Sequence, residues 1–201
     1  MNIIYQLLFL LLTYLVAAIP FGLVLAKIFA KTDIRQLGSK NIGATNVTRI
    51  LGKKLGFFTL VLDGAKGALM VVIARFLFQD LSNLHLFLVF VSGVAVIAHI
   101  YPVYLAFKGG KGVATAIAVL LALDSLVGFF VACFWIISFC LFRVSAIASL
   151  TAILSSIILS YFFGAPISQI VFCCFLFVLI LFRHKENISR LNLERKKNYK
   201  K

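Results

Sequence analysis

The sequence predicts an all-α integral membrane protein. Of its 201 residues, 63% are hydrophobic, the mean hydropathy is +1.09, and long uncharged stretches alternate with short basic ones. Soluble domains are roughly 45–50% apolar, so this composition indicates membrane spans. The net charge of +14 then favours membrane orientation and anionic ligands over nucleic acid, because the basic residues lie between the apolar stretches.

Seven apolar segments are candidates for crossing the membrane. A helix needs about 20 apolar residues to cross the hydrocarbon, with a range of roughly 17–25. The first segment has no basic residues before its apolar core, so we expect a retained span and not a signal peptide. Segment 113–123 is short and is expected to be a buried or partial crossing. In chain order the segments are 3–29, 55–78, 84–107, 113–123, 126–142, 144–163 and 167–182.

The distribution of charge predicts the orientation. With the N-terminus outside and seven crossings, the outer connections near Asp80, near Asp124 and at 164–166 contain no Lys or Arg. The basic residues then crowd the inner connections, as the positive-inside rule requires. We therefore expect one membrane-embedded domain over residues 1–201, with a short basic tail at 192–201 and polar loops on the cytoplasmic face.

The first polar segment, residues 38–49, is rich in Gly, Ser, Asn and Thr. Short polar side chains supply hydrogen-bond donors, and glycines let the backbone approach a ligand. If a helix resumes near Ala44, Thr45 and Arg49 lie four residues apart on one face. Arg49 then offers a bidentate fork to a phosphate. An ordinary basic turn is the alternative interpretation.

The second segment places three glycines and two lysines directly before the apolar stretch that starts at Val113. Free N–H groups at a helix start form an anion site, and lysine adds a point charge. The expected phosphate-binding residues here are Gly109, Gly110, Lys111, Gly112 and Thr115, beside Lys108. The spacing does not match the Walker A pattern, so a nucleoside triphosphatase is not supported. A flexible basic connector is the alternative.

The third segment follows the last span and contains Arg183, His184 and Asn187. Its basic residues by themselves fit an ordinary cytoplasmic helix end. Deeper in the membrane, Asp63 and Lys66 are three residues apart, and charges inside a span usually face the bundle interior as pairs. We expect Asp63, Lys66 and His99 to support the site structurally. No cluster with metal-ligand spacing is present in the sequence.

Taken together, these segments resemble the motifs of the bacterial glycerol-3-phosphate acyltransferase that uses acyl phosphate (the PlsY family). The resemblance covers nearly the whole chain, from 18–22 to Asn187. Its most specific parts are 43–46, 107–115 and the Arg183-His184 pair with Asn187. This chain departs from the family pattern at Lys40 and Ile42, where Gly and often Pro are usual, and at Ala98 and Ile100, where Gly and Asn are usual.

The resemblance implies transfer of a fatty acyl group from acyl phosphate to the 1-hydroxyl of sn-glycerol 3-phosphate, the first acylation of phospholipid synthesis. It places Ser39, Arg49, His184 and Asn187 around glycerol 3-phosphate. Asn41, Thr45 and Asn46 are expected to add phosphate contacts. Either His184 or an oxygen of the acyl phosphate would accept the hydroxyl proton.

The resemblance implies no cofactor, a location in the bacterial cytoplasmic membrane, contact with membrane lipids, and a partner enzyme that makes acyl phosphate. No His-x4-Asp pattern follows any histidine; that pattern marks the acyltransferases that use thioester donors. Two other functions compete. A small transporter of an organic phosphate would use Gly-interrupted spans, and an anionic-lipid binder would use the basic tail.

Overall fold

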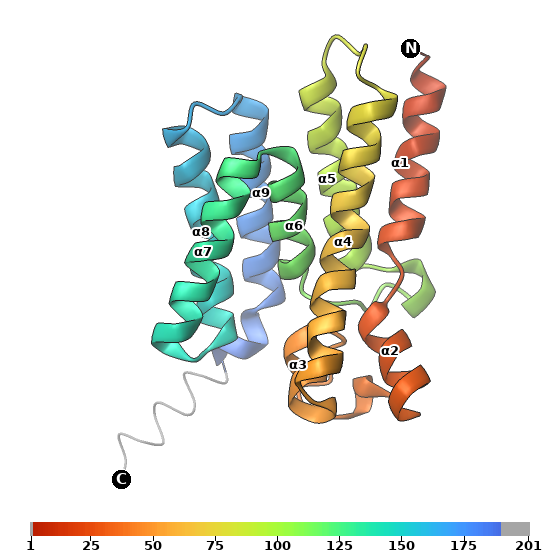
Figure 1. Cartoon of the computed structure of the whole chain (residues 1–201), viewed down its shortest axis with the longest axis vertical. Coiled ribbons are helices and arrows are strands. Elements are labelled where there is room, and N and C mark those ends of the chain that lie inside the picture. Colours follow the sequence, from red (N-terminus) through yellow and green to blue (C-terminus); the bar gives the residue numbers. More distant parts are fainter. Residues whose placement is uncertain (1, 190–201) are drawn as a thin grey trace.

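The computed structural model describes residues 2–189, so the predicted tail at 192–201 lies outside the described residues. The described part folds into nine α-helices and two short 3-10 helices (Figure 1). The elements in chain order are α1 (Ile3–Ala17), α2 (Phe21–Ala30), η1 (Ile34–Gln36), α3 (Ala44–Leu51), α4 (Lys53–Leu77), α5 (Leu84–Ile100), η2 (Val103–Leu105), α6 (Val113–Leu123), α7 (Ser125–Phe142), α8 (Ser145–Phe162) and α9 (Ile167–Arg183).

The helices form two groups joined by α6. Helices α1, α4 and α5 pack together on one side, α7, α8 and α9 pack on the other, and α6 contacts members of both (Figure 1). Helices α2 and α3 pack against the N-terminal end of α4. The central place of α6 explains why its residues Ala116, Val119 and Leu120 are completely buried.

The predicted apolar segments are confirmed as helices. Five helical stretches are long and apolar enough to cross a membrane, namely Ile3–Ala30, Lys53–Leu77, Leu84–Leu105, Ser125–Phe142 and Ser145–Phe162. Val113–Leu123 and Ile167–Arg183 are shorter apolar helices. At about 1.5 Å per residue, the 11 residues of α6 rise only about 16 Å. This is roughly half the hydrocarbon thickness, so α6 is too short to cross it alone.

Arg75 closes the end of α6 that is farther from the glycine-rich segment. Its Nη2 donates to the carbonyl oxygens of Ala122 at 2.8 Å and Leu123 at 3.0 Å. Asp124 then caps α7 by accepting from the Val127 N–H at 3.1 Å. A cation at the carboxyl end of a helix and an acid at the start of the next both complement the helix dipoles. These contacts let the short helix end inside the bundle.

The first span is broken at Pro20, between α1 and α2. Proline has no N–H and its ring clashes with the preceding helical turn, so a continuous helix is disfavoured. The break frees the carbonyl of Ile19, which accepts a hydrogen bond of 2.7 Å from Lys66 Nζ. Within a membrane, an interrupted helix is tolerated where other groups satisfy its backbone. The buried lysine of α4 does this here.

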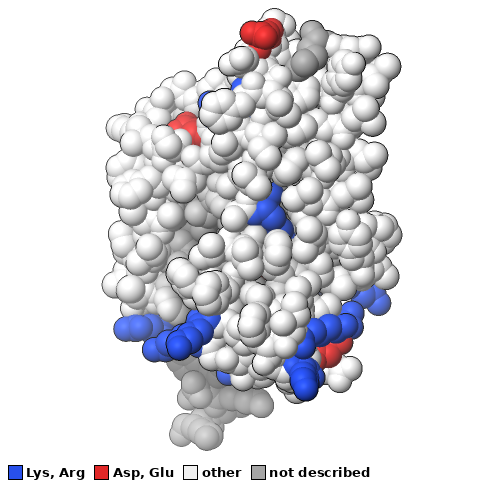
Figure 2. Space-filling view, turned by 45° about the vertical axis from the view of Figure 1, so that its right-hand side comes forward, with Lys and Arg blue, Asp and Glu red and all other residues white. Residues whose placement is uncertain are grey.

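Basic side chains gather at one end of the molecule, which we call the basic end. It comprises α2, α3, the start of α4, the turn at Arg143 between α7 and α8, and the end of α9 (Figures 1 and 2). On the face shown in Figure 2, most of the Lys and Arg surface lies at this lower end, with a further basic patch near mid-height and small ones near the upper end. The polar segments predicted to carry function therefore share one half of the molecule.

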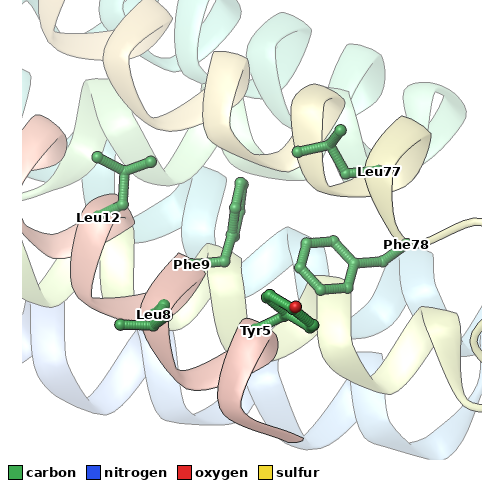
Figure 3. Close-up of a pocket in the computed structure, with 6 residues that line it drawn as sticks. All are labelled: Tyr5, Leu8, Phe9, Leu12, Leu77 and Phe78. Atoms are coloured by element: carbon green, nitrogen blue, oxygen red, sulfur yellow. The ribbon is translucent and has the colours of Figure 1, made fainter. Parts of the chain in front are cut away.

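A shallow apolar groove of about 360 Å³ lies at the opposite end (Figure 3). Phe9 of α1 packs edge-on against Phe78 at the end of α4, with ring centroids 5.3 Å apart. The groove is lined by Tyr5, Leu8, Phe9, Leu12, Leu77 and Phe78. This apolar lining does not suit a phosphate, whereas the basic end carries the charges that would bind one.

Candidate active site

Asn46 organises the loop that precedes α3. Its Oδ1 accepts from the Ser39 N–H at 2.9 Å, and its side chain is almost completely buried. Its Nδ2 donates to three carbonyl oxygens, those of Ile34 at 3.3 Å, Leu37 at 3.0 Å and Asn41 at 2.9 Å. The side-chain amide of Asn46 thus fixes the conformation of residues 34–46. The position of Ser39 follows from that conformation.

The predicted helix beginning at Ala44 is confirmed as α3, with Thr45 and Arg49 both exposed on it. Asn41 Oδ1 accepts from the Gly43 N–H at 2.8 Å and so closes the turn into the helix. Lys40 has φ +59°, a left-handed conformation that favours glycine. Lys40 therefore adopts a backbone conformation that glycine would adopt more readily.

Residues 108–112, which we call the glycine loop, connect η2 to α6. The Gly109 N–H donates to Ile100 O at 3.0 Å, and the Gly110 N–H donates to His99 O at 3.1 Å. Gly112 has φ +86° and directly precedes α6. Two glycine N–H groups are thus used inside the protein. An anion at this loop would meet the lysine side chains and the first N–H groups of α6.

Thr115 faces α4. Its Oγ1 donates to the backbone oxygen of Asp63 at 2.8 Å, and the residue is completely buried. This contact fixes the first turn of α6 against α4, next to Gly64 and Gly67, where an added Cβ would come close to α6. Thr115 therefore positions the start of α6.

The end of α9 meets the glycine loop, so the structure brings the second and third polar segments together. Lys111 Nζ donates to Asn187 Oδ1. Arg183 Nη2 lies 3.3 Å from Gly109 O and 3.2 Å from Gly110 O, and its guanidinium lies over the Tyr101 ring at 5.5 Å. Lys108 is exposed beside these contacts. This meeting point concentrates three cationic side chains and an amide.

His184 follows α9 directly and is 3% exposed. Its Nδ1 lies 2.8 Å from Ile180 O, an acceptor, so Nδ1 carries the proton in the neutral ring and Nε2 carries the lone pair. The pKa of His184 is lowered to about 4, mainly by burial and also by the nearby charges of Lys111 and Arg183, while the hydrogen bond to Ile180 acts in the opposite direction. At neutral pH the ring therefore presents a hydrogen-bond acceptor.

We predict that His184 stays neutral well below the usual histidine pKa. In ¹⁵N-histidine-labelled protein in detergent, the ring signal lost in His184→Gln should titrate near pH 4. A midpoint near 6.5 would contradict the buried placement. Because the unfolded ring binds a proton near 6.5 and the folded ring near 4, this group's contribution to the free energy of unfolding is complete above pH 6.5. It is lost as the pH falls towards 4.

Asp63 and Lys66 form a buried ion pair beneath the glycine loop. Their side chains are both 3% exposed, and Lys66 Nζ lies 2.9 Å from Asp63 Oδ1. The Phe21 N–H also reaches the Asp63 carboxylate, and His99 Nδ1 lies 3.7 Å from Asp63 Oδ1. The pairing of Asp63 with Lys66 in the bundle interior is thus as expected from the sequence, and the structure adds His99 to it.

The chain as a whole is similar to known proteins. The family described as Glycerol-3-phosphate acyltransferase matches residues 7–193. This chain belongs to that family. The acyltransferase is 44% identical to a Glycerol-3-phosphate acyltransferase of Jannaschia sp. (strain CCS1) over 182 residues, which are 90% of this chain and 86% of the relative. It is also 44% identical to that of Myxococcus xanthus (strain DK1622), over 90% of this chain and 93% of the relative.

Two solved structures share the fold of the acyltransferase. The crystal structure of PlsY (YgiH), an integral membrane glycerol 3-phosphate acyltransferase, in its glycerol 3-phosphate form is 39% identical, with a TM-score of 0.88 over 95% of this chain and 94% of that one. Its lysophosphatidic acid form has a TM-score of 0.85 over 95% and 93%. The resemblance read from the motifs is thereby confirmed, as is the all-helical membrane fold.

Sequence reasoning did not assign Arg183 a place in the acyltransferase site. A basic residue at the end of a last span is ordinary under the positive-inside rule, so its contacts with Gly109 and Gly110 leave no signal in the sequence. Nor did the sequence distinguish side chains that face a ligand from those that hold the loops. Asn46 and Thr115 belong to the second group by their contacts.

Proposed function

We propose that this acyltransferase moves a fatty acyl group from acyl phosphate to the 1-hydroxyl of sn-glycerol 3-phosphate, giving lysophosphatidic acid and inorganic phosphate. The observation that carries the proposal is the hydrogen bond between Lys111 of the glycine loop and Asn187, which follows α9, with Lys108 exposed in the same loop. Membership of an acyltransferase family decides between an enzyme and a transporter built from the same features.

We assign Lys108, Lys111 and the N–H groups at the start of α6 to a substrate phosphate, with Gly109, Gly110 and Gly112 shaping the loop. Ser39, Arg49, His184 and Asn187 are proposed to surround glycerol 3-phosphate, with Thr45 and Asn41 at its edge. Asn46 and Thr115, whose polar groups bind backbone, are proposed to position these elements. The acyl chain would extend among the apolar helices.

The reaction forms a bond between the glycerol 1-oxygen and the acyl carbon, and it breaks the bond between that carbon and the phosphate oxygen. An acyl phosphate is already activated, so positioning and charge stabilisation are the main tasks of the protein. The lone pair on His184 Nε2 is proposed to accept a hydrogen bond from the attacking hydroxyl. The pKa of His184 is about 4, below the value of about 6 for a phosphate, so the proton ends on the departing phosphate.

The concentration of Lys and Arg at the basic end supports a cytoplasmic location for this end. The N-terminus would then lie outside, in the orientation expected from the sequence. The protein would reside in the bacterial cytoplasmic membrane, with lipids around its apolar surface. Acyl phosphate must be supplied by an enzyme that phosphorylates a free fatty acid or phosphorolyses an activated one, and we propose such an enzyme as a functional partner.

Radiolabelled glycerol 3-phosphate, offered with palmitoyl phosphate or palmitoyl coenzyme A to purified protein in detergent, tests reaction and donor together. We expect labelled lysophosphatidic acid with palmitoyl phosphate only, because the sequence lacks the His-x4-Asp pattern of thioester-using enzymes. Product from the thioester alone would refute the donor. No product from either donor, with protein that is monodisperse and melts cooperatively, would refute the proposed reaction.

A further inference from the structure

Gly109 and Gly110 lie directly against His99 of α5. The Gly110 N–H donates to His99 O at 3.1 Å. A Cβ added to Gly110 would lie 2.0 Å from His99 Nε2, and its three closest neighbours would all be atoms of the imidazole ring. The ring therefore occupies the space where any larger residue at position 110 would put its side chain.

Gly109 is confined in a different way. A Cβ there would lie 2.3 Å from His99 O, 2.4 Å from Pro102 Cδ and 2.8 Å from Ile100 O. Two of these atoms are backbone and the third belongs to a rigid proline ring, so no change of the His99 side chain relieves the clash. A larger residue at position 110 would thus clash with a side chain, and one at position 109 would clash mainly with backbone atoms. The two glycines can therefore be compared directly.

Arg183 holds the same two residues from α9. Its Nη2 lies within hydrogen-bond distance of both Gly109 O and Gly110 O, and its guanidinium lies over Tyr101. The N–H groups of Gly109 and Gly110 thus bond to the end of α5, while their oxygens bond to the end of α9. Lys108 and Lys111 flank this segment in the sequence.

The His99 ring lies against the buried pair of Asp63 and Lys66 in α4. The residue is 4% exposed, and its Nδ1 lies 3.7 Å from Asp63 Oδ1, whose other contacts include Lys66 Nζ. Lys66 in turn bonds to Ile19 O in the break between α1 and α2. A ring enclosed by this network has little freedom to move away from Gly110.

We propose that His99 and Arg183 form a clamp that sets the position of the glycine loop, and that position 110 is glycine because the His99 ring fills its side-chain space. His99 and Arg183 are positioning residues that act through Lys108 and Lys111. The inference rests on the proposed role of the glycine loop in binding a substrate phosphate.

Removing the ring should rescue a larger residue at position 110 but not at position 109. We expect Gly110→Ala and Gly109→Ala each to raise KM for a phosphate-bearing substrate and to lower kcat/KM by at least about 10-fold, because misplaced binding groups have large effects. Adding His99→Ala should restore kcat/KM of Gly110→Ala by at least about five-fold, as expected for coupled neighbours. The same addition should not improve Gly109→Ala.

Cooperative thermal unfolding of each variant in detergent serves as the folding control. Where His99→Ala does not give folded protein, His99→Asn, which also removes the ring but keeps a polar group, takes its place. Equal activities of Gly110→Ala with and without the His99 change would overturn the clamp. Rescue of Gly109→Ala to the same extent would also overturn it. In both of these outcomes the wild-type protein remains active, so they contradict the clamp alone. An inactive wild-type protein would contradict the proposed function.

Discussion

Replacing Lys111 by alanine is expected to lower kcat/KM by about 10²–10³-fold, the loss typical of removing one group that stabilises charge in a transition state. Lys111 carries a positive charge at the start of α6, and it also bonds to Asn187 beyond the end of α9. Its loss would remove a counter-charge for phosphate and release the amide that it holds. Steady-state kinetics with glycerol 3-phosphate and palmitoyl phosphate measure the effect.

A double-mutant cycle with Asn187→Ala separates these two roles. Because the two side chains share a hydrogen bond, the double variant should lose less activity than the product of the two single losses. Lys27→Ala is the matched control, since Lys27 is an exposed lysine of α2 with no assigned role in the site. Independent losses in the cycle, or an equal loss in the control, would contradict the assignment of Lys111.

The helices were predictable because lipid imposes a simple rule on sequence. A chain in hydrocarbon must satisfy its backbone internally, so long apolar segments become helices. Each of the seven apolar segments is helical in the structure, and α6 spans the predicted 113–123. The break at Pro20 was harder to predict, because neighbouring groups often let a proline remain within a transmembrane helix. Here Lys66 satisfies the freed carbonyl, a contact across 47 residues of sequence.

The site was predictable in composition but not in the partners of each side chain. Asparagine and threonine bind phosphate oxygens and backbone groups with the same atoms, so the sequence leaves the choice open. The fold assigns Asn46 to the loop carbonyls and Thr115 to Asp63 O. Lys111 and Asn187 are 76 residues apart in the chain, and only the packing of the two helix groups around α6 brings them together.

Lys40 is one of the departures from the family pattern, and the sequence left its effect on the loop open. In the structure Lys40 has a left-handed φ of +59°, which costs a residue other than glycine roughly 1–2 kcal/mol. The Asn46 contacts around this loop hold it in that shape. These hydrogen bonds therefore help to offset the unfavourable backbone conformation of Lys40.

Breaking the buried pair between Asp63 and Lys66 is expected to have the largest effect on stability. Asp63→Asn would leave the Lys66 ammonium, 3% exposed, without a counter-charge inside the bundle. Unpairing one partner of a buried pair costs about 3–5 kcal/mol, which corresponds to a fall in Tm on the order of 10 °C for a chain of this size. Thermal unfolding in detergent measures it, with Asp80→Asn at an exposed position between α4 and α5 as the matched control.

The double variant Asp63→Asn with Lys66→Met should recover most of that loss. Methionine is close in length to lysine and carries no charge, so the double variant leaves no unpaired charge in the bundle interior. A double variant no more stable than Asp63→Asn would contradict this account. It would mean that the bond from Lys66 to Ile19 O, and not neutralisation of Asp63, is what the lysine provides. Because Thr115 bonds to the backbone of Asp63, α6 should keep its position in the double variant, and activity should recover together with stability.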